Sequence, residues 1–252
     1  MRSMNVELKN KRVVAVDGGT ATGKGRLIEE LAQLLRGKGV PVIHISTGSV
    51  FRALSYLAIE LKAPDVPEKL GLTDAEINHK ALDLIRDMSA DELMALARNH
   101  LIEMHNGHVW IDNEPASVDD QLKAPAVGTG ASILGDVAEV RRWMTGITRR
   151  QINEFDGYVL IDGRDISHQV VPDAPLKLLL TVAPEVAAAR SKEHTIEEVI
   201  ARDTRDRARP FGQLKHPDDP GEGVIVVPTD EHSPESLRDH VFELMQGVFK
   251  GL

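Results

Sequence analysis

The chain contains no cysteine among its 252 residues. This absence excludes disulfides, thiolate zinc sites and cysteine nucleophiles, and it fits a reducing cytosol. Basic residues are also in deficit, because 30 lysines and arginines stand against 39 aspartates and glutamates, a net charge of −9. An acidic chain argues against binding to duplex nucleic acid, so we expect a small ligand and no nucleic acid as partner.

Long apolar runs are missing as well. No run approaches the ~20 residues that span a bilayer, and residues 1–12 lack the apolar stretch of a signal peptide. We therefore expect a cytoplasmic protein with no membrane partner. The ten histidines show no metal-ligand spacing, and no Ser/His/Asp pattern stands out. Apolar content of 42% and charged content of 27% are ordinary globular values for a chain with a sizeable core.

A glycine-rich segment at 17–26 (D-G-G-T-A-T-G-K-G-R) organises the chain. It follows an apolar run, Val13–Val16, and precedes an amphipathic pattern over 27–35. Strand, glycine-rich turn and helix form the context in which G-x-x-x-x-G-K binds phosphate. The loop N–H groups converge on phosphate oxygens, and the helix N-terminus favours their negative charge. The expected phosphate contacts are Gly18, Gly19, Thr20, Ala21, Thr22, Gly23, Lys24, Gly25 and Arg26.

The residue after the loop lysine departs from the usual pattern. Strict phosphate-binding loops place Ser or Thr there to hold Mg²⁺, whereas Gly25 and then Arg26 follow Lys24. Arg26 has the i,i+4 spacing for an ion pair with Glu30. We interpret the segment as a phosphate-binding loop in which the usual side-chain ligand of magnesium is altered.

Apolar runs separated by helical patterns predict an α/β protein. Strands that are apolar throughout indicate a parallel sheet covered by helices on both faces. The stretch 63–122 differs in character and is expected to be an inserted subdomain within a core of 1–62 and 123–252. Strands are expected at 13–16, 40–45, 158–161, 176–182 and 223–227. Helices are expected at 50–61 (capped by 46–49), 74–88, 90–105, 137–155, in a charged stretch at 184–209, and at the C-terminus.

Three further clusters are candidates for anion binding. They are 46–52 (S-T-G-S-V-F-R), 162–165 (D-G-R-D) and 202–209 (R-D-T-R-D-R-A-R). In an open α/β sheet these clusters would meet at the carboxyl ends of the strands. Asp162 is placed like the carboxylate that orders magnesium or its waters in other phosphate-loop enzymes. Taken singly, the clusters are also explained as a helix cap with a surface arginine, an ion-paired turn and a solvated helix face.

Together and in this order, the four segments resemble bacterial cytidylate kinases, a group of nucleoside monophosphate kinases. The most specific part is D-G-R-D at 162–165 followed by V-V-P-D-A-P-L-K at 170–177. The stretch from Ala131-Ser132 to Val140-Arg141 also resembles a family segment whose serine and arginine contact cytosine. The resemblance implies a five-stranded parallel sheet of the P-loop NTPase type, an inserted monophosphate-binding subdomain at 63–122 and a short lid at about 184–209.

The resemblance also implies an activity and a role for each matching residue. The activity is transfer of a phosphoryl group from ATP to CMP or dCMP, with Mg²⁺ as cofactor, by a monomer. Lys24 and the loop amides would hold ATP, and Asp162 would order the magnesium through water. Arg52 and Arg209 would bind the monophosphate, and Arg202 and Asp206 would contact the sugar and the transferring group. The pyrimidine contacts would be Thr47, Ser132, Arg141, Arg164 and Asp165. The catalytic residues would be Lys24, Arg164, Arg202 and Arg209.

Several residues depart from the family pattern. Ala21 stands where the family usually has Gly, Ser46 where it has Asp, Phe51 where it has Tyr, and Arg26 where it has Thr; the lid is also shorter. Two other hypotheses therefore stay open. The chain is either a P-loop kinase for another small metabolite or nucleotide, or a catalytically weak nucleotide-binding regulatory protein.

Overall fold

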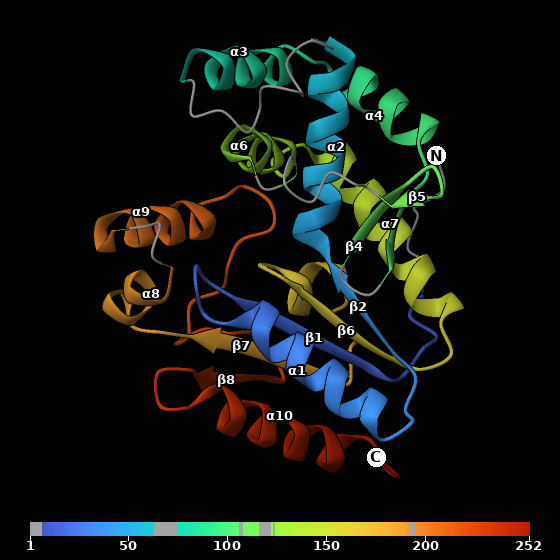
Figure 1. Cartoon of the computed structure of the whole chain (residues 1–252), viewed down its shortest axis with the longest axis vertical. Helices are drawn as coiled ribbons and strands as arrows, with labels where there is room; N and C mark the ends of the chain where they lie inside the picture. The colour runs from blue at the N-terminus through green and yellow to red at the C-terminus, as the bar shows by residue number, and fades with distance from the viewer. Residues whose placement is uncertain (1–6, 63–74, 106–107, 116–121, 123, 192–194) are drawn as a thin grey trace. The chain divides into compact units, whose positions relative to one another are not determined.

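The computed structural model describes residues 7–62, 75–105, 108–115, 122, 124–191 and 195–252 (Figure 1). Its contacts divide the chain into two compact units. We call Val6–Ile45 with Arg149–Leu252 the sheet unit, and Ser46–Thr148 the helical unit. Each unit is described separately below.

The sheet unit is built on the five predicted strands, in the order β2-β6-β1-β7-β8. β1 pairs in parallel with β6 on one side and β7 on the other, and β7 pairs in parallel with β8. The predicted α/β fold with a five-stranded sheet is confirmed. The strands are β1 (Val13–Gly18), β2 (Val42–Ser46), β6 (Tyr158–Gly163), β7 (Leu176–Thr181) and β8 (Val224–Pro228).

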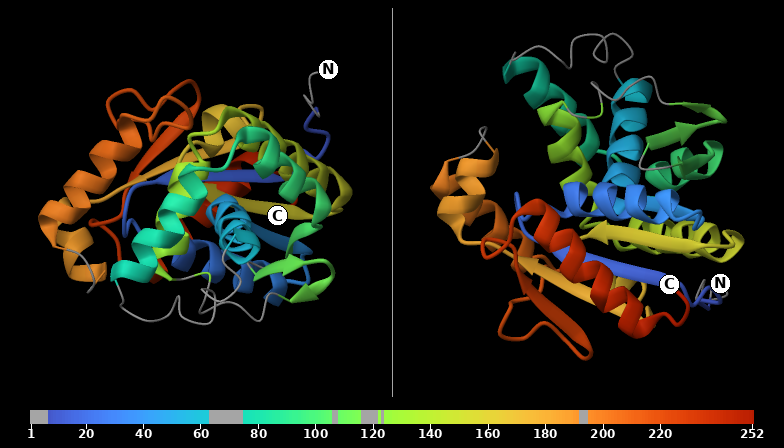
Figure 2. Two further views of the ribbon diagram at one scale, coloured as in Figure 1. Left: turned by 90° about the horizontal axis from the view of Figure 1, so that it is seen from above. Right: turned by 60° about the horizontal axis from the view of Figure 1, so that its bottom comes forward.

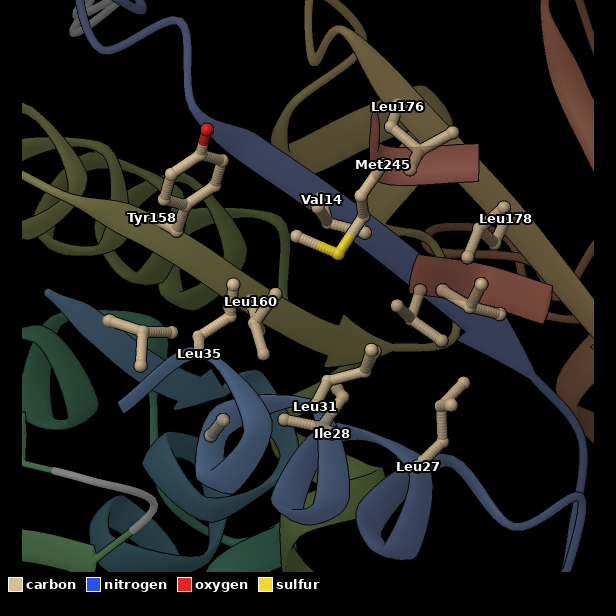
Figure 3. Packing of buried hydrophobic residues seen from close by; sticks show 14 of the residues in the cluster. Val14, Leu27, Ile28, Leu31, Leu35, Tyr158, Leu160, Leu176, Leu178 and Met245 are labelled. Atoms are coloured by element: carbon tan, nitrogen blue, oxygen red, sulfur yellow. The ribbon is translucent and has the colours of Figure 1, made fainter. Parts of the chain in front are cut away.

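Two helices cover one face of this sheet. α1 (Lys24–Gly37) packs against α10 (Pro234–Val248), and the pair can be followed in blue and red in Figure 2. The apolar residues of α1 recur every three or four positions, which places them on one side of the helix. Figure 3 shows these side chains directed at the strands, with Met245 of α10 in the same cluster. The labelled members are Val14, Leu27, Ile28, Leu31, Leu35, Tyr158, Leu160, Leu176, Leu178 and Met245.

The opposite face of the sheet is also buried. Val13, Ala15 and Ile161 are fully inaccessible, so the strands carry apolar side chains on both faces, as buried parallel strands do. One turn of π-helix, η2 (Ile166–Val170), packs against β1 and β6. The charged stretch after β7 forms two helices, α8 (Pro184–Ser191) and α9 (Ile196–Arg207).

The helical unit is organised around α2 (Thr47–Lys62), which contacts three helices and a small antiparallel sheet. The sheet has the order β3-β4-β5. The helix α7 (Ala138–Glu154) begins in this unit and ends in the sheet unit. The other elements are α3 (Ala75–Arg86), α4 (Ala90–Asn99), α6 (Pro125–Leu134), β3 (Ile102–His105), β4 (His108–Ile111) and β5 (Glu114–Pro115).

Two sequence predictions in this unit were wrong, and one helix was missed. The helix expected at 90–105 ends at Asn99, because Ile102 and Met104 alternate with polar residues and pair with β4 as a strand. The helix α6 was not predicted, because its glycines and small residues weaken the periodic signal. The helix expected to begin near Val50 begins earlier, since Ser46 ends β2 and α2 begins directly at Thr47.

The predicted boundaries of the inserted subdomain remain a prediction. Residues 63–74 and 116–121 lie outside the described ranges, and both boundaries fall at or beside them. Within the described ranges, no helix has both the length and the apolar character that crossing a membrane requires.

Candidate functional site

The glycine-rich segment forms the turn between β1 and α1. Gly18 is the last strand residue, and Gly23 precedes the helix with φ of 86°, a left-handed conformation that glycine adopts without strain. Ala21 has φ of 51° in the same turn. A side chain in that region costs about 1 kcal/mol or more, so the alanine is accommodated at some cost in stability.

Lys24 is the first residue of α1 and folds back over the loop. Its Nζ donates to the carbonyl oxygens of Gly18 and Gly19, both at 2.8 Å, and lies 3.3 Å from the Thr22 hydroxyl. Burial lowers the pKa of Lys24 to about 7, and the positive charge of Arg164 acts in the same direction. The negative charge of Asp162 opposes this shift. An anion at the loop would therefore strongly favour the charged form of this amine.

Arg164 reaches the same loop from the neighbouring strand. Asp17 and Gly163 are partners in the β1–β6 register, so the residue after β6 lies beside the loop. The Arg164 guanidinium donates to the Gly18 carbonyl oxygen at 2.8 Å. Burial lowers the pKa of Arg164, the charges of Arg202 and Arg209 lower it further, and the carboxylates of Asp206 and Asp203 raise it. Two cations thus meet at one carbonyl oxygen of the phosphate-binding loop.

The helix α9 supplies carboxylates to this cluster. Asp206, whose side chain is 5% exposed, lies 3.1 Å from Arg164 Nε and 2.9 Å from an Arg209 nitrogen. Asp203 accepts from the Thr20 N–H at 2.9 Å and the Thr20 hydroxyl at 2.8 Å. A Cβ on Gly19 would overlap Asp203 Oδ2, so a side chain at position 19 would displace the Asp203 carboxylate. The carboxylates at positions 203 and 206, three residues apart, share one side of α9.

A second buried carboxylate ties the loop strand to the D-G-R-D turn. Asp17 of β1 accepts from the backbone N–H groups of Ile166 at 2.7 Å and Ser167 at 2.8 Å. Burial raises the pKa of Asp17 to about 6, although both hydrogen bonds act against that shift. This residue holds the start of η2 against β1 and therefore fixes where the preceding turn lies.

The raised pKa of Asp17 predicts a stability that falls with pH. The folded state holds the proton up to about pH 6 and the unfolded state loses it near 3.8, so stability falls as pH rises between these values. In Asp17→Asn this dependence is absent. The free energy of unfolding is measured with denaturant for both proteins. Relative to that of the variant, the wild-type value should fall by about 2 kcal/mol from pH 4.5 to 7.5. The exposed Asp230→Asn change is the control, and a constant difference for Asp17→Asn would contradict the assignment.

The Asp162 carboxylate lies in a different environment from that of Asp17, beside a histidine. Its Oδ1 lies 2.8 Å from Nε2 of His44, which belongs to β2, the strand next to β6. Magnesium in phosphoryl-transfer sites is held by one or two carboxylates together with substrate phosphates and water. Among the described residues no group of three or more His, Asp or Glu side chains is arranged to hold a metal ion. One carboxylate at the loop fits a magnesium that arrives with its nucleotide.

The predicted substrate contacts are divided between the two units. In the helical unit, Thr47 is the buried first residue of α2, and the Arg52 guanidinium donates to the Leu122 carbonyl at 2.7 Å. Burial lowers the pKa of Arg52. The Arg141 guanidinium of α7 lies 5.6 Å from the Phe51 ring centroid and donates to the Gly135 carbonyl. The Ser132 hydroxyl of α6 donates to the Gly128 carbonyl at 3.4 Å. The unit thus has an arginine over an aromatic ring.

The sheet unit brings together the largest part of the predicted set. Lys24, Arg164, Arg202, Asp206 and Arg209 form one charged cluster at the loop, and Asp165 is buried next in sequence to Arg164. Arg26 pairs with glutamates instead, as its spacing from Glu30 predicted. Its guanidinium pairs with Glu30 at 2.8 Å and lies 3.9 Å from Glu235. A role of the Arg26 side chain in nucleotide binding remains a prediction.

Three residues of the site were missed in the sequence. Asp203 could have been found, because it lies three positions before Asp206 on the same helix face. Asp17 carried a weaker signal, a carboxylate at the end of an apolar run. His44 carried none, since its partner lies 118 positions away and only the strand order makes them neighbours.

Known proteins resemble this chain over most of its length. The family cytidylate kinase matches residues 14–247. The chain is 26% identical over 244 residues to a cytidylate kinase of Aquifex aeolicus, covering 92% of this chain and 95% of the relative. It is 28% identical over 257 residues to that of Bacillus cereus, covering 95% and 99%. Among solved structures, TT1252 from Thermus thermophilus aligns with 96% of this chain and 100% of its own, at 15% identity and a TM-score of 0.45.

The family match spans the loop, the D-G-R-D turn and α9, which are the parts that build the charged cluster. The two relatives are matched over 95% and 99% of their own length. The chain therefore belongs to the cytidylate kinase family and is an enzyme of the nucleoside monophosphate kinase class.

Proposed function

We propose that the protein transfers a phosphoryl group from ATP to CMP or dCMP with Mg²⁺, yielding ADP and CDP or dCDP. The observation that supports this most is the meeting of Lys24 and Arg164 at the Gly18 carbonyl, each at 2.8 Å. Two cations at one oxygen repel each other, and an anionic phosphate at the loop would relieve that repulsion. The pyrimidine specificity is carried over from the family.

The cationic cluster supplies the chemistry that this transfer needs. The attacking group is a phosphate oxygen of the acceptor, and it is largely ionised at neutral pH because the second pKa of a phosphate monoester is about 6. No general base is then required. Lys24, Arg164, Arg202 and Arg209 are proposed to neutralise the charge that develops on the transferring group. When bound, Mg²⁺ supplies further charge neutralisation between the phosphates, and Asp162 is the residue we assign to its waters.

The acceptor contacts are proposed residue by residue. We assign Thr47, Ser132 and Arg141, together with Arg164 and Asp165, to the pyrimidine. Arg52 and Arg209 are assigned to the monophosphate, and Arg202 and Asp206 to the sugar and the transferring group. The half-buried guanidinium of Arg52, whose pKa is lowered by burial, supports the phosphate role, because an anion would stabilise its charge.

Three further features are proposed from the family resemblance. Residues 63–122 are the monophosphate-binding insert, and the stretch from α8 to α9 is the lid that excludes water during transfer. The enzyme acts as a monomer in the cytoplasm.

The Phe51 ring beneath Arg141 is proposed to keep the guanidinium extended by a cation–π contact.

An acceptor panel tests the proposal. ADP release from ATP and Mg²⁺ is measured with CMP, dCMP, UMP, AMP, GMP and shikimate. Turnover on CMP and dCMP with little on the others is the expected result. Turnover confined to another acceptor would show that the pocket has been reassigned, and no turnover with nucleotide binding intact would indicate a regulatory protein.

A matched pair of variants tests the pyrimidine assignment in the same assay. Arg141→Met should raise the KM for CMP about tenfold or more, because a charged hydrogen-bond donor is lost. Arg142→Met is the control, since that neighbouring side chain is 70% exposed and pairs with Glu139. Equal KM values for the two variants would remove Arg141 from the base-binding set.

A further inference from the structure

His44 has a defined partner that the phosphate-binding pattern does not require. It lies on β2, and its Nε2 is 2.8 Å from Oδ1 of Asp162 on the adjacent strand β6. Both side chains are largely buried, with 18% and 14% of their surfaces exposed. A carboxylate accepts hydrogen bonds, so Nε2 is assigned the proton that it donates. The contact fixes one oxygen of Asp162 in a particular direction.

Three carboxylates act on Lys24, and each of them is held by other groups of the chain. The charges of Asp162, Asp17 and Asp203 all raise the pKa of this lysine. Asp17 accepts from two backbone N–H groups, and Asp203 accepts from the N–H and hydroxyl of Thr20. The Asp162 carboxylate, by comparison, is contacted by the side chain of His44.

The loop also lacks the hydroxyl that usually holds magnesium. Gly25 follows Lys24 and offers no side-chain oxygen, and the next residue, Arg26, is paired with Glu30. The protein's part in binding magnesium then depends more heavily on one carboxylate. The direction of a lone carboxylate matters for metal affinity, and the group that bonds to it sets that direction.

We propose that His44 is a positioning residue that orients Asp162 toward Mg²⁺ or its waters. This inference rests on the proposed function, because it assigns the Asp162 carboxylate to the magnesium of the nucleotide. The imidazole does not touch the substrate. Its N–H holds Oδ1 of Asp162, and that bond restrains the orientation of the carboxylate. A simple strand-to-strand pair with no bearing on metal binding is the competing explanation.

Two replacements at position 44 separate these explanations. His44→Gln keeps an N–H donor that can reach Asp162, whereas His44→Met fills similar space without one. His44→Leu serves as a second apolar replacement if the methionine variant does not fold. The first readout is Mn²⁺ binding to the enzyme–ADP complex, followed by the electron paramagnetic resonance signal of free Mn²⁺. The second is the Mg²⁺ concentration for half-maximal turnover, compared with kcat at saturating Mg²⁺.

The apolar variants should weaken Mn²⁺ binding and raise the half-saturating Mg²⁺ about tenfold, the size typical for loss of a group behind a metal ligand. Their kcat at saturating Mg²⁺ should stay within about twofold of wild type, and His44→Gln should restore metal affinity. In an Asp162→Asn background, the change at position 44 should have no further effect on metal binding. A lower kcat with unchanged metal affinity, or equal behaviour of the glutamine and apolar variants, would overturn the inference.

The two proposals fail in different ways. If the wild-type protein does not phosphorylate CMP but His44→Met still weakens Mn²⁺ binding to the ADP complex, the acceptor assignment is wrong and the role of His44 stands. If wild type phosphorylates CMP and metal affinity is the same in all position-44 variants, only the inference about His44 is wrong.

Discussion

Replacing Lys24 by methionine is expected to lower kcat about a hundredfold to a thousandfold while leaving the protein at least as stable as wild type. The Nζ of Lys24 lies at the loop carbonyls of Gly18 and Gly19. With nucleotide bound, its charge would face the transferring phosphate, where a fixed cation is worth several kcal/mol to the transition state.

The effect on stability follows from the lowered pKa of Lys24. The folded state releases the proton above about pH 7, whereas the unfolded state holds it to about 10.5. Between these values the unfolded state binds more protons, so wild-type stability rises with pH. At pH 7.5 the buried lysine therefore destabilises the fold by up to about 4 kcal/mol, which the methionine variant avoids. The lost hydrogen bonds to the loop carbonyls offset part of this gain.

Activity and denaturant unfolding are measured together for this variant between pH 7 and 9. The wild-type protein should gain stability over this range and Lys24→Met should not. The exposed Lys250→Met change is the control for removing one positive charge. Full activity in Lys24→Met would remove Lys24 from the catalytic residues, and a variant much less stable than wild type at pH 7.5 would show that Lys24 has a structural role.

Replacing Arg164 by methionine is expected to lower both activity and stability. Arg164 links three segments, since it donates to Gly18 of the loop, follows β6 in sequence and pairs with Asp206 of α9. Removing one partner of a buried ion pair costs about 3 to 5 kcal/mol. Arg209 still pairs with Asp206, so we expect a loss near the lower limit. The fall in kcat should match or exceed that of the lysine variant, because the position of α9 is also disturbed.

A double-mutant cycle isolates the Arg164–Asp206 pair. Asp206→Asn alone leaves two guanidiniums without their shared carboxylate and should also destabilise the protein. The double variant should lose clearly less stability than the sum of the single losses, because the pair is removed together. Arg205→Met is the matched control on the same helix, where the side chain is exposed. Additive losses in the cycle would contradict the ion pair.

Sequence patterns predicted the framework of the site well. Apolar runs flanked by turns indicated all five strands, and parallel pairing places their carboxyl ends together. The loop, D-G-R-D and the α9 cluster were therefore expected to meet, and in the sheet unit they do. Local patterns of this kind are readable because each depends on residues close in sequence.

Contacts between distant residues could not be predicted in the same way. The bond from Thr20 to Asp203 spans 183 positions, and its existence depends on where α9 lies. The pairing of His44 with Asp162 depends on β2 being next to β6, and apolar runs carry no information on strand order. The helix expected at 90–105 failed for a related reason, because strand pairing with β4 determined the conformation of 102–105.

The measurement that tests the central claim most directly is the product balance of a single reaction. Wild-type protein is incubated with ATP, Mg²⁺ and CMP, and all nucleotides are quantified by chromatography, with Lys24→Met in parallel. Phosphoryl transfer through the loop lysine predicts one CDP for every ADP in wild type, and about a hundredfold less of both products in the folded variant over the same time. ADP formed without CDP, or CDP formed equally well by Lys24→Met, would contradict it.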